Sequence, residues 1–229
     1  SGSANNSGDI NATVSANTTA GFSIVTWTGN GSNKDTIAHG LGVKPSVVMY
    51  KARSNTGSWY VMTDAIDGTD DYLQLHTTVA KTDNNTSAHG FQTSSTISNW
   101  TWYSDYEMVA YCFAEVEGFS KFGSYTGNGS SAGPLIHTGF RPAYVLIKDT
   151  TDASYNWKIF DNKRQTENVM NLGLWTDLTN AESTSAVNIL DFYSNGFKLR
   201  GSGNAQNKNN NVLLYMAFAE SPFKYANAR

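Results

Sequence analysis

The feature that most constrains this chain of 229 residues is one stretch that occurs twice. The first copy reads Trp27-Thr-Gly-Asn-Gly-Ser and continues through His39 into an apolar run. The second reads Tyr125-Thr-Gly-Asn-Gly-Ser and continues through His137 into a similar run. A period of roughly a hundred residues is too long for a solenoid repeat and fits a duplicated small domain. Residues present in both copies are therefore expected to serve the fold, and residues present in one copy to serve a function.

Short β-branched and aromatic runs, bounded by Gly, Asn, Asp and Pro, follow one another from Gly21 onwards. No window has the apolar period of an amphipathic helix. The pattern predicts an all-β fold with two tandem, sequence-related β-sandwich repeats of jelly-roll type, over residues 21–117 and 118–229. Because the short joint Glu115–Gly118 links the copies, we expect them to pack as one rigid unit. Residues 1–20 are small and polar, which predicts a flexible linker or tag.

Composition narrows the classes of function. Charged residues make up only 15% of the chain and the formal net charge is −3, so we expect no nucleic-acid partner. No apolar run approaches the ~18 residues of a membrane span, and we expect no membrane insertion. Cys112 is the only cysteine, which excludes a disulfide framework and a thiolate metal site. Because no nucleophile–base signature occurs, we expect no enzyme, and we also expect no cofactor.

The only metal-like motif is Asp67-Gly-Thr-Asp70-Asp71, which resembles a carboxylate-rich calcium loop. It lacks the EF-hand pattern, which favours a solvated turn, and we expect no bound metal. Three pairs of polar or aromatic residues recur in both copies, and the recurrence favours a structural role for each. We expect turn-binding histidines, core tryptophans and solvated lysines at strand ends: His39 and His137, Trp59 and Trp157, Lys51 and Lys148.

Aromatic residues that occur in one copy only point to a binding site. The segment Asn99–Tyr106 carries two tryptophans and two tyrosines where the second copy has a polar run. In an extended segment, Trp100 and Trp102 would lie on one face. Aromatic rings beside amides and acids suit sugar binding, although aromatic residues are also enriched at subunit interfaces. The predicted ligand-binding residues, including one in the enlarged part of the second copy, are Asn99, Trp100, Trp102, Tyr103, Asp105 and Trp175.

Several long strings resemble a known family. They lie at residues 110–129, 138–148, 194–200 and 215–220. They are similar to uncharacterised domains in virion structural proteins of tailed bacteriophages, especially marine phages. The resemblance covers the chain from Gly21 to its end and carries over no catalytic residue. It implies a location in the virion, in a fibre, spike or other surface appendage.

Three functions remain open from these observations. The first is a phage tail-fibre or spike domain that binds a host cell-surface receptor, a glycan above all. The second is a structural head-decoration or tail-assembly domain, in which the unpaired aromatic residues contact other virion subunits. The third, which has least support, is a polysaccharide-degrading enzyme. By analogy with fibre architecture, a homotrimer would be the usual assembly.

Overall fold

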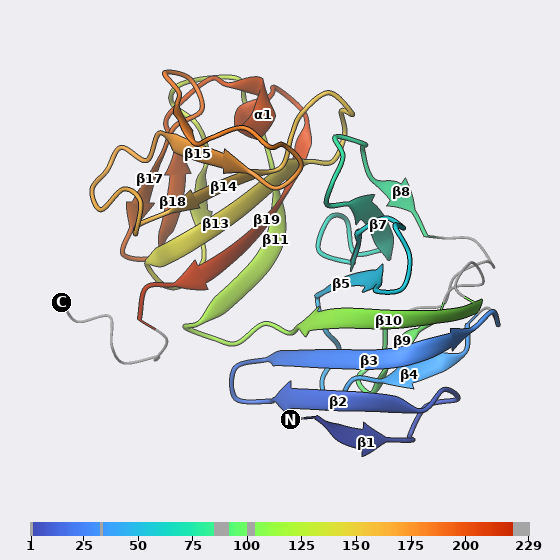
Figure 1. Ribbon diagram of the computed structural model, residues 1–229. Coiled ribbons are helices and arrows are strands. Elements are labelled where there is room, and N and C mark those ends of the chain that lie inside the picture. Colours follow the sequence, from blue (N-terminus) through green and yellow to red (C-terminus); the bar gives the residue numbers. More distant parts are fainter. Residues whose placement is uncertain (1, 33, 85–91, 100–103, 222–229) are drawn as a thin grey trace. The chain divides into compact units, whose positions relative to one another are not determined.

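The computed structural model describes residues 2–32, 34–84, 92–99 and 104–221 (Figure 1). In these ranges the chain forms antiparallel β-sheets, and the one helix is α1 (Asn204–Asn207). The prediction of an all-β fold is confirmed. No helix in the described part of the chain is long and apolar enough to span a membrane.

The chain divides into two compact units. The first unit contains residues 1–64, 68–74 and 82–115, and the second contains 65–67, 75–81 and 116–229. The division after Glu115 falls close to the expected boundary after Glu117. Two short segments of the first half of the sequence nevertheless belong to the second unit.

The first unit is built on a sheet that has eight strands among the described residues. A separate pair of short strands is formed by β4 (Thr36–Ala38) and β9 (Thr96–Ser98). In spatial order the strands of the large sheet are β1 (Ser3–Asn5), β2 (Ala12–Asn17), β3 (Phe22–Asn30), β10 (Ser104–Phe113), β5 (Val47–Ala52), β6 (Tyr60–Thr63), β7 (Asp71–Gln74) and β8 (Thr82–Asp83).

Alternation along β3 separates two faces of this sheet. Val25 and Trp27 are buried in the core, together with Met108 of β10. Ile24 and Thr28 are exposed on the opposite side, because successive side chains of a strand point to opposite faces. We call this second side the outer face.

The strands β1 and β2 occupy the segment that we expected to be a flexible linker, and that prediction is wrong. β2 pairs with β3 from Ala12 to Asn17, and β1 pairs with β2. Ala12 and Val14 are buried in the core beside Val25. The segment Ala12–Asn17 alternates small apolar and polar residues, a strand signal that the polar composition of residues 1–20 obscured, and it pairs with the edge of β3.

The second unit contains a sheet that has six strands in the described ranges. A smaller sheet beside it has the order β12 (Leu135–His137), β18 (Gly196–Leu199) and β17 (Leu190–Tyr193). In spatial order the strands of the larger sheet are β11 (Ser120–Thr126), β19 (Val212–Ala219), β13 (Pro142–Asp149), β14 (Lys158–Asp161), β15 (Leu172–Trp175) and β16 (Ser183–Thr184).

The two large sheets have related strand orders. The order β3-β10-β5-β6-β7-β8 in the first unit parallels β11-β19-β13-β14-β15-β16 in the second. β10 lies between β3 and β5, and β19 lies in the same way between β11 and β13, where β5 and β13 each follow a His-containing turn. The first unit adds β1 and β2 outside β3.

Residues at corresponding positions do not share one environment. His39 is fully buried, and its Nδ1 accepts a hydrogen bond from Leu41 N at 3.2 Å, as expected for a turn-binding histidine. Burial lowers the pKa of this imidazole. His137, in contrast, is exposed. The prediction of a solvated charge is wrong for Lys148, which is fully buried.

Candidate functional site

Asn99 belongs to the scaffold, which corrects its prediction as a ligand-binding residue. Its side chain is 1% exposed, and its Oδ1 accepts a hydrogen bond from Trp27 Nε1 at 3.2 Å. Its Nδ2 donates to Asn30 Oδ1 at 3.1 Å and to Ser32 O at 3.0 Å. Because both ends of the amide are used inside the first unit, none of its polar atoms is left for a ligand.

The second unit repeats this arrangement with Asn207. Its Nδ2 donates to Asn128 Oδ1 at 3.1 Å and to Ser130 O at 2.8 Å. Asn128 and Ser130 belong to the second Thr-Gly-Asn-Gly-Ser stretch, as Asn30 and Ser32 belong to the first. A buried asparagine therefore holds the same turn in each unit.

The other predicted ligand-binding residues have different outcomes. Trp100, Trp102 and Tyr103 lie outside the described residues. Asp105 is exposed at the start of β10, has a φ of 62° and accepts a hydrogen bond from Ser104 Oγ at 3.0 Å. Trp175 is half-buried in the second unit, where Lys158 Nζ lies 5.6 Å from its ring centroid.

A polar groove lies on the outer face of the first unit. Its cavity volume is about 520 Å³, and it runs over β1, β2, β3 and the start of β10. Thr13 pairs with Thr26 across β2 and β3, and Thr28 pairs with Glu107 across β3 and β10. Hydroxyl, amide and charged groups line the groove, among them Asn6, Asn11, Thr13, Thr28, Arg53 and Glu107.

Two charged side chains in this groove have no partner within the part of the chain that is described. Arg53 and Glu107 are both exposed, and their hydrogen bonds there use backbone atoms. Arg53 N donates to Glu107 O at 2.6 Å, and Glu107 N donates to Ser54 Oγ at 3.0 Å. The backbones that carry the guanidinium and the carboxylate are thus held side by side, and among the described residues both charged groups are available to a ligand.

A row of aromatic rings follows on the same outer face. Tyr111 lies between Phe22, at a centroid distance of 6.4 Å, and Trp59, at 6.1 Å. The ring planes are nearly parallel, with interplanar angles of 7° and 21°. Lys51 Nζ lies 5.9 Å from the Trp59 ring centroid and donates to Gly57 O at 2.5 Å. All three rings are half-buried, so their positions are held by packing while part of each is accessible.

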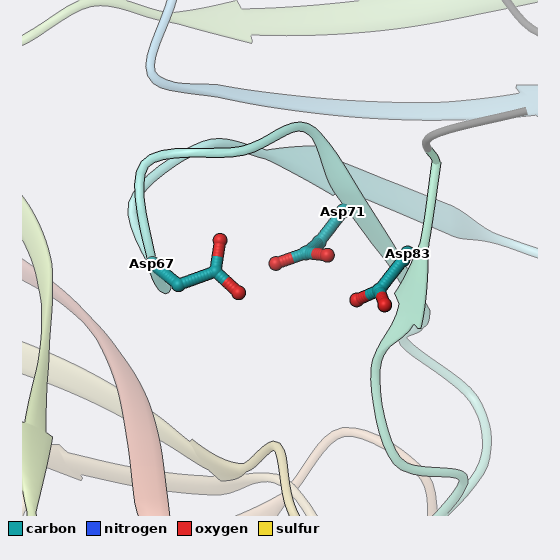
Figure 2. A group of neighbouring side chains, drawn as sticks. All are labelled: Asp67, Asp71 and Asp83. Atoms are coloured by element: carbon teal, nitrogen blue, oxygen red, sulfur yellow. The ribbon is translucent and has the colours of Figure 1, made fainter.

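Three aspartates, shown in Figure 2, form a cluster of carboxylates. Asp67, Asp71 and Asp83 each offer an oxygen, and these oxygens lie within 4.8 Å of one another. Asp71 is buried, while Asp67 and Asp83 are exposed. Calcium prefers six to eight oxygen ligands, and Lys81 Nζ already pairs with Asp67 Oδ2 at 2.7 Å. The prediction of a solvated turn fits Asp67, which is exposed, and is wrong for Asp71, which is buried.

Two lysines of the second unit are buried in different ways. Lys148 Nζ donates to three backbone oxygens, Thr78 O at 2.9 Å, Asp149 O at 2.7 Å and Tyr155 O at 2.9 Å. Lys158 Nζ lies over the rings of Phe160 and Trp175. Burial lowers the pKa of each ammonium to about 8.

Comparison with known proteins identifies the family. The model of a domain of unknown function, DUF7483, matches residues 1–222. The chain belongs to the DUF7483 family. No curated protein and no solved structure matches it. The DUF7483 match spans both units, including the hairpin formed by β1 and β2.

Comparison of the two copies by sequence predicted Trp59 as a core residue, and this prediction is wrong. Trp157 is fully buried, as expected, but Trp59 is half-buried on the outer face. The available signal was the pattern of β3, in which Phe22 and Ile24 are apolar although Val25 and Trp27 already supply the core face. Apolar residues on both faces of a strand indicate a second surface that is packed or used for binding.

Proposed function

We propose that this chain is a surface domain of a bacteriophage virion, in a tail fibre or spike, that binds a glycan on the host cell. The phage location rests on the sequence resemblance at residues 110–129 and the other matching strings. The observation that carries the binding function is the groove on the outer face of the first unit.

The chemistry of the groove favours a sugar over an apolar ligand. Sugar hydroxyls both donate and accept hydrogen bonds, and the groove offers hydroxyls, amides, a guanidinium and a carboxylate. Within the described ranges, the side chains of Arg53 and Glu107 have no internal bond that must break before they contact a ligand. Because the two charges are opposite and adjacent, they suit a neutral or zwitterionic sugar better than a strongly acidic one.

We further propose that the two units arose by duplication of one β-sandwich of jelly-roll type. The related strand orders of the two large sheets support this origin. So do Asn99 and Asn207, which hold corresponding turns with corresponding bonds. After such a duplication, the outer face of each copy would be free to acquire its own use.

An array of bacterial capsule and O-antigen polysaccharides tests the glycan-binding function. The labelled full-length chain should bind at least one polysaccharide, and the double variant R53A/E107A should lose that signal. Both side chains are exposed, so the variant is expected to fold. The exposed Lys163, in the second unit, provides a matched control, K163A, that should bind normally. If the R53A/E107A variant binds the polysaccharide as strongly as the parent protein does, the groove is not the binding site.

The structural alternative makes a different prediction. If the aromatic row of the outer face were a subunit interface, the chain would form an oligomer that Trp59→Ala dissociates. Analytical ultracentrifugation of both proteins distinguishes this outcome from a receptor site. Dissociation by Trp59→Ala, with no array signal for the parent protein, would replace receptor binding with virion assembly.

A further inference from the structure

The groove and the first ring of the aromatic row lie on the same face of one strand, β3. On the outer face, β3 presents Thr28, Thr26, Ile24 and Phe22 in order. Thr26 and Thr28 line the groove, whereas Phe22 begins the row of rings. At about 3.3 Å per residue, the path from Thr28 to Phe22 is about 20 Å long.

The neighbouring strand continues this path. Glu107 of β10 is opposite Thr28, and Tyr111 is opposite Ile24. The side chain between the polar and the aromatic part on β3 is Ile24, which is 38% exposed. A ligand that leaves the groove along β3 therefore meets an exposed apolar residue and then the rings.

The rings are held in place before any ligand arrives. Tyr111 stacks with Phe22 on one side and with Trp59 on the other. Lys51 of β5 places its ammonium group over the Trp59 ring, and the same group donates a hydrogen bond to Gly57 O. Holding a binding surface rigid reduces the entropy lost on association.

We infer that the ligand is an extended oligosaccharide that lies along β3 from the polar groove to Phe22 and then crosses the sheet along the aromatic row, so that its later sugar rings contact Tyr111 of β10 and Trp59 beside β6. This inference rests on the proposed glycan-binding function and specifies its ligand. The apolar faces of successive sugar rings contact the aromatic row, while Arg53 and Glu107 fix the orientation of the end that lies in the groove. A single sugar contacts only the groove, and a longer chain gains the aromatic contacts.

The test is a length series. Fragments of the polysaccharide with the strongest array signal are separated by size, and their affinities are measured by isothermal titration calorimetry. Affinity should rise with chain length until a fragment spans the outer face, and then level off. Trp59→Ala should weaken the longest fragments about tenfold, as expected for loss of one buried aromatic contact, and leave the shortest unchanged.

A second variant tests the same ligand path independently, in case Trp59→Ala does not fold. Ile24→Arg places a long charged side chain on the exposed path between the groove and the rings, away from the core. It should lower affinity for long fragments only. Tyr193→Ala, at an exposed aromatic residue of the second unit, is the matched control and should bind all fragments as the parent does. Trp175→Ala tests the ligand-binding residue that the sequence predicted in the second unit.

The outcomes separate the two proposals. Absence of any array signal overturns the glycan-binding function itself. Equal affinity for short and long fragments overturns only the extended ligand, as does equal weakening of all lengths by Trp59→Ala. Weakening by Trp175→Ala, with no effect of Trp59→Ala or Ile24→Arg, places the ligand on the second unit and also overturns this inference.

Discussion

Replacing Lys158 with methionine should make the second unit more stable at neutral pH. Lys158 lies on the strand position that faces the core, two residues before the fully buried Phe160. A Cβ on Gly173 would collide with Lys158 Cε, so the lysine stem is closely packed. Its 2% exposed side chain contacts aromatic rings, and in the described ranges no hydrogen bond or ion pair reaches its amine.

The magnitude follows from the pKa of Lys158. Burial lowers this pKa from 10.5 to about 8, which corresponds to a cost of about 3 kcal/mol for keeping the charge at pH 7. Methionine fills a similar volume without a charge, and the lost contacts of the ammonium with the rings are worth about 1–2 kcal/mol. The variant should therefore gain about 1–2 kcal/mol in unfolding free energy at pH 7.

The pH dependence gives a sharper signature. Between pH 8 and 10.5 the unfolded chain holds a proton on Lys158 that the folded protein has lost, so folding stability rises with pH. From pH 7 to 9.5 this gain is about 2 kcal/mol, and the variant should lack it. The raised pKa of Tyr144, about 12, acts in the opposite direction only at higher pH.

Urea unfolding at pH 7 and pH 9.5, followed by tryptophan fluorescence, measures both effects. Lys163→Met, at an exposed position in the same unit, controls for the loss of a surface charge. If Lys158→Met is destabilised at pH 7 and retains the full rise in stability towards pH 9.5, the reasoning is refuted. In that case the amine has a partner that stabilises its charge.

Three further predictions concern the scaffold, and thermal or urea unfolding measures each. Lys148→Met should lower stability by about 2 kcal/mol, the opposite sign to Lys158→Met, because three buried carbonyl oxygens lose their donor; an increase would contradict this. Asn99→Ala and Asn207→Ala should each cost about 1–3 kcal/mol, and a neutral effect at either site would show that its turn is held by other contacts. Val14→Asp should cost at least about 2 kcal/mol, and a fully stable variant would mean that β2 is not packed on the core.

Much of the fold class could be predicted from local pattern. Short β-branched runs between turn residues gave the strand content, and the recurring Thr-Gly-Asn-Gly-Ser stretch marked corresponding turns. The polar composition of residues 1–20 concealed β2, in which Ala12 and Val14 alternate with Thr13 and Ser15 and are buried once the strand pairs with β3. Asp83 was also missed in the acidic cluster, because strand pairing with Asp71 brings it there from twelve residues away in the sequence.

Local sequence pattern is enough to establish that this chain forms strands, where most of them lie and which side chains share a face, because strand alternation is a local property. Which faces are covered depends on tertiary contacts. Trp59 and Trp157 occupy corresponding places in the two copies, yet one is half-buried on an outer face and the other is fully buried. Lys51 and Lys148 differ in the same way. Burial depends on what packs over a strand, and that is set by contacts between segments far apart in the chain.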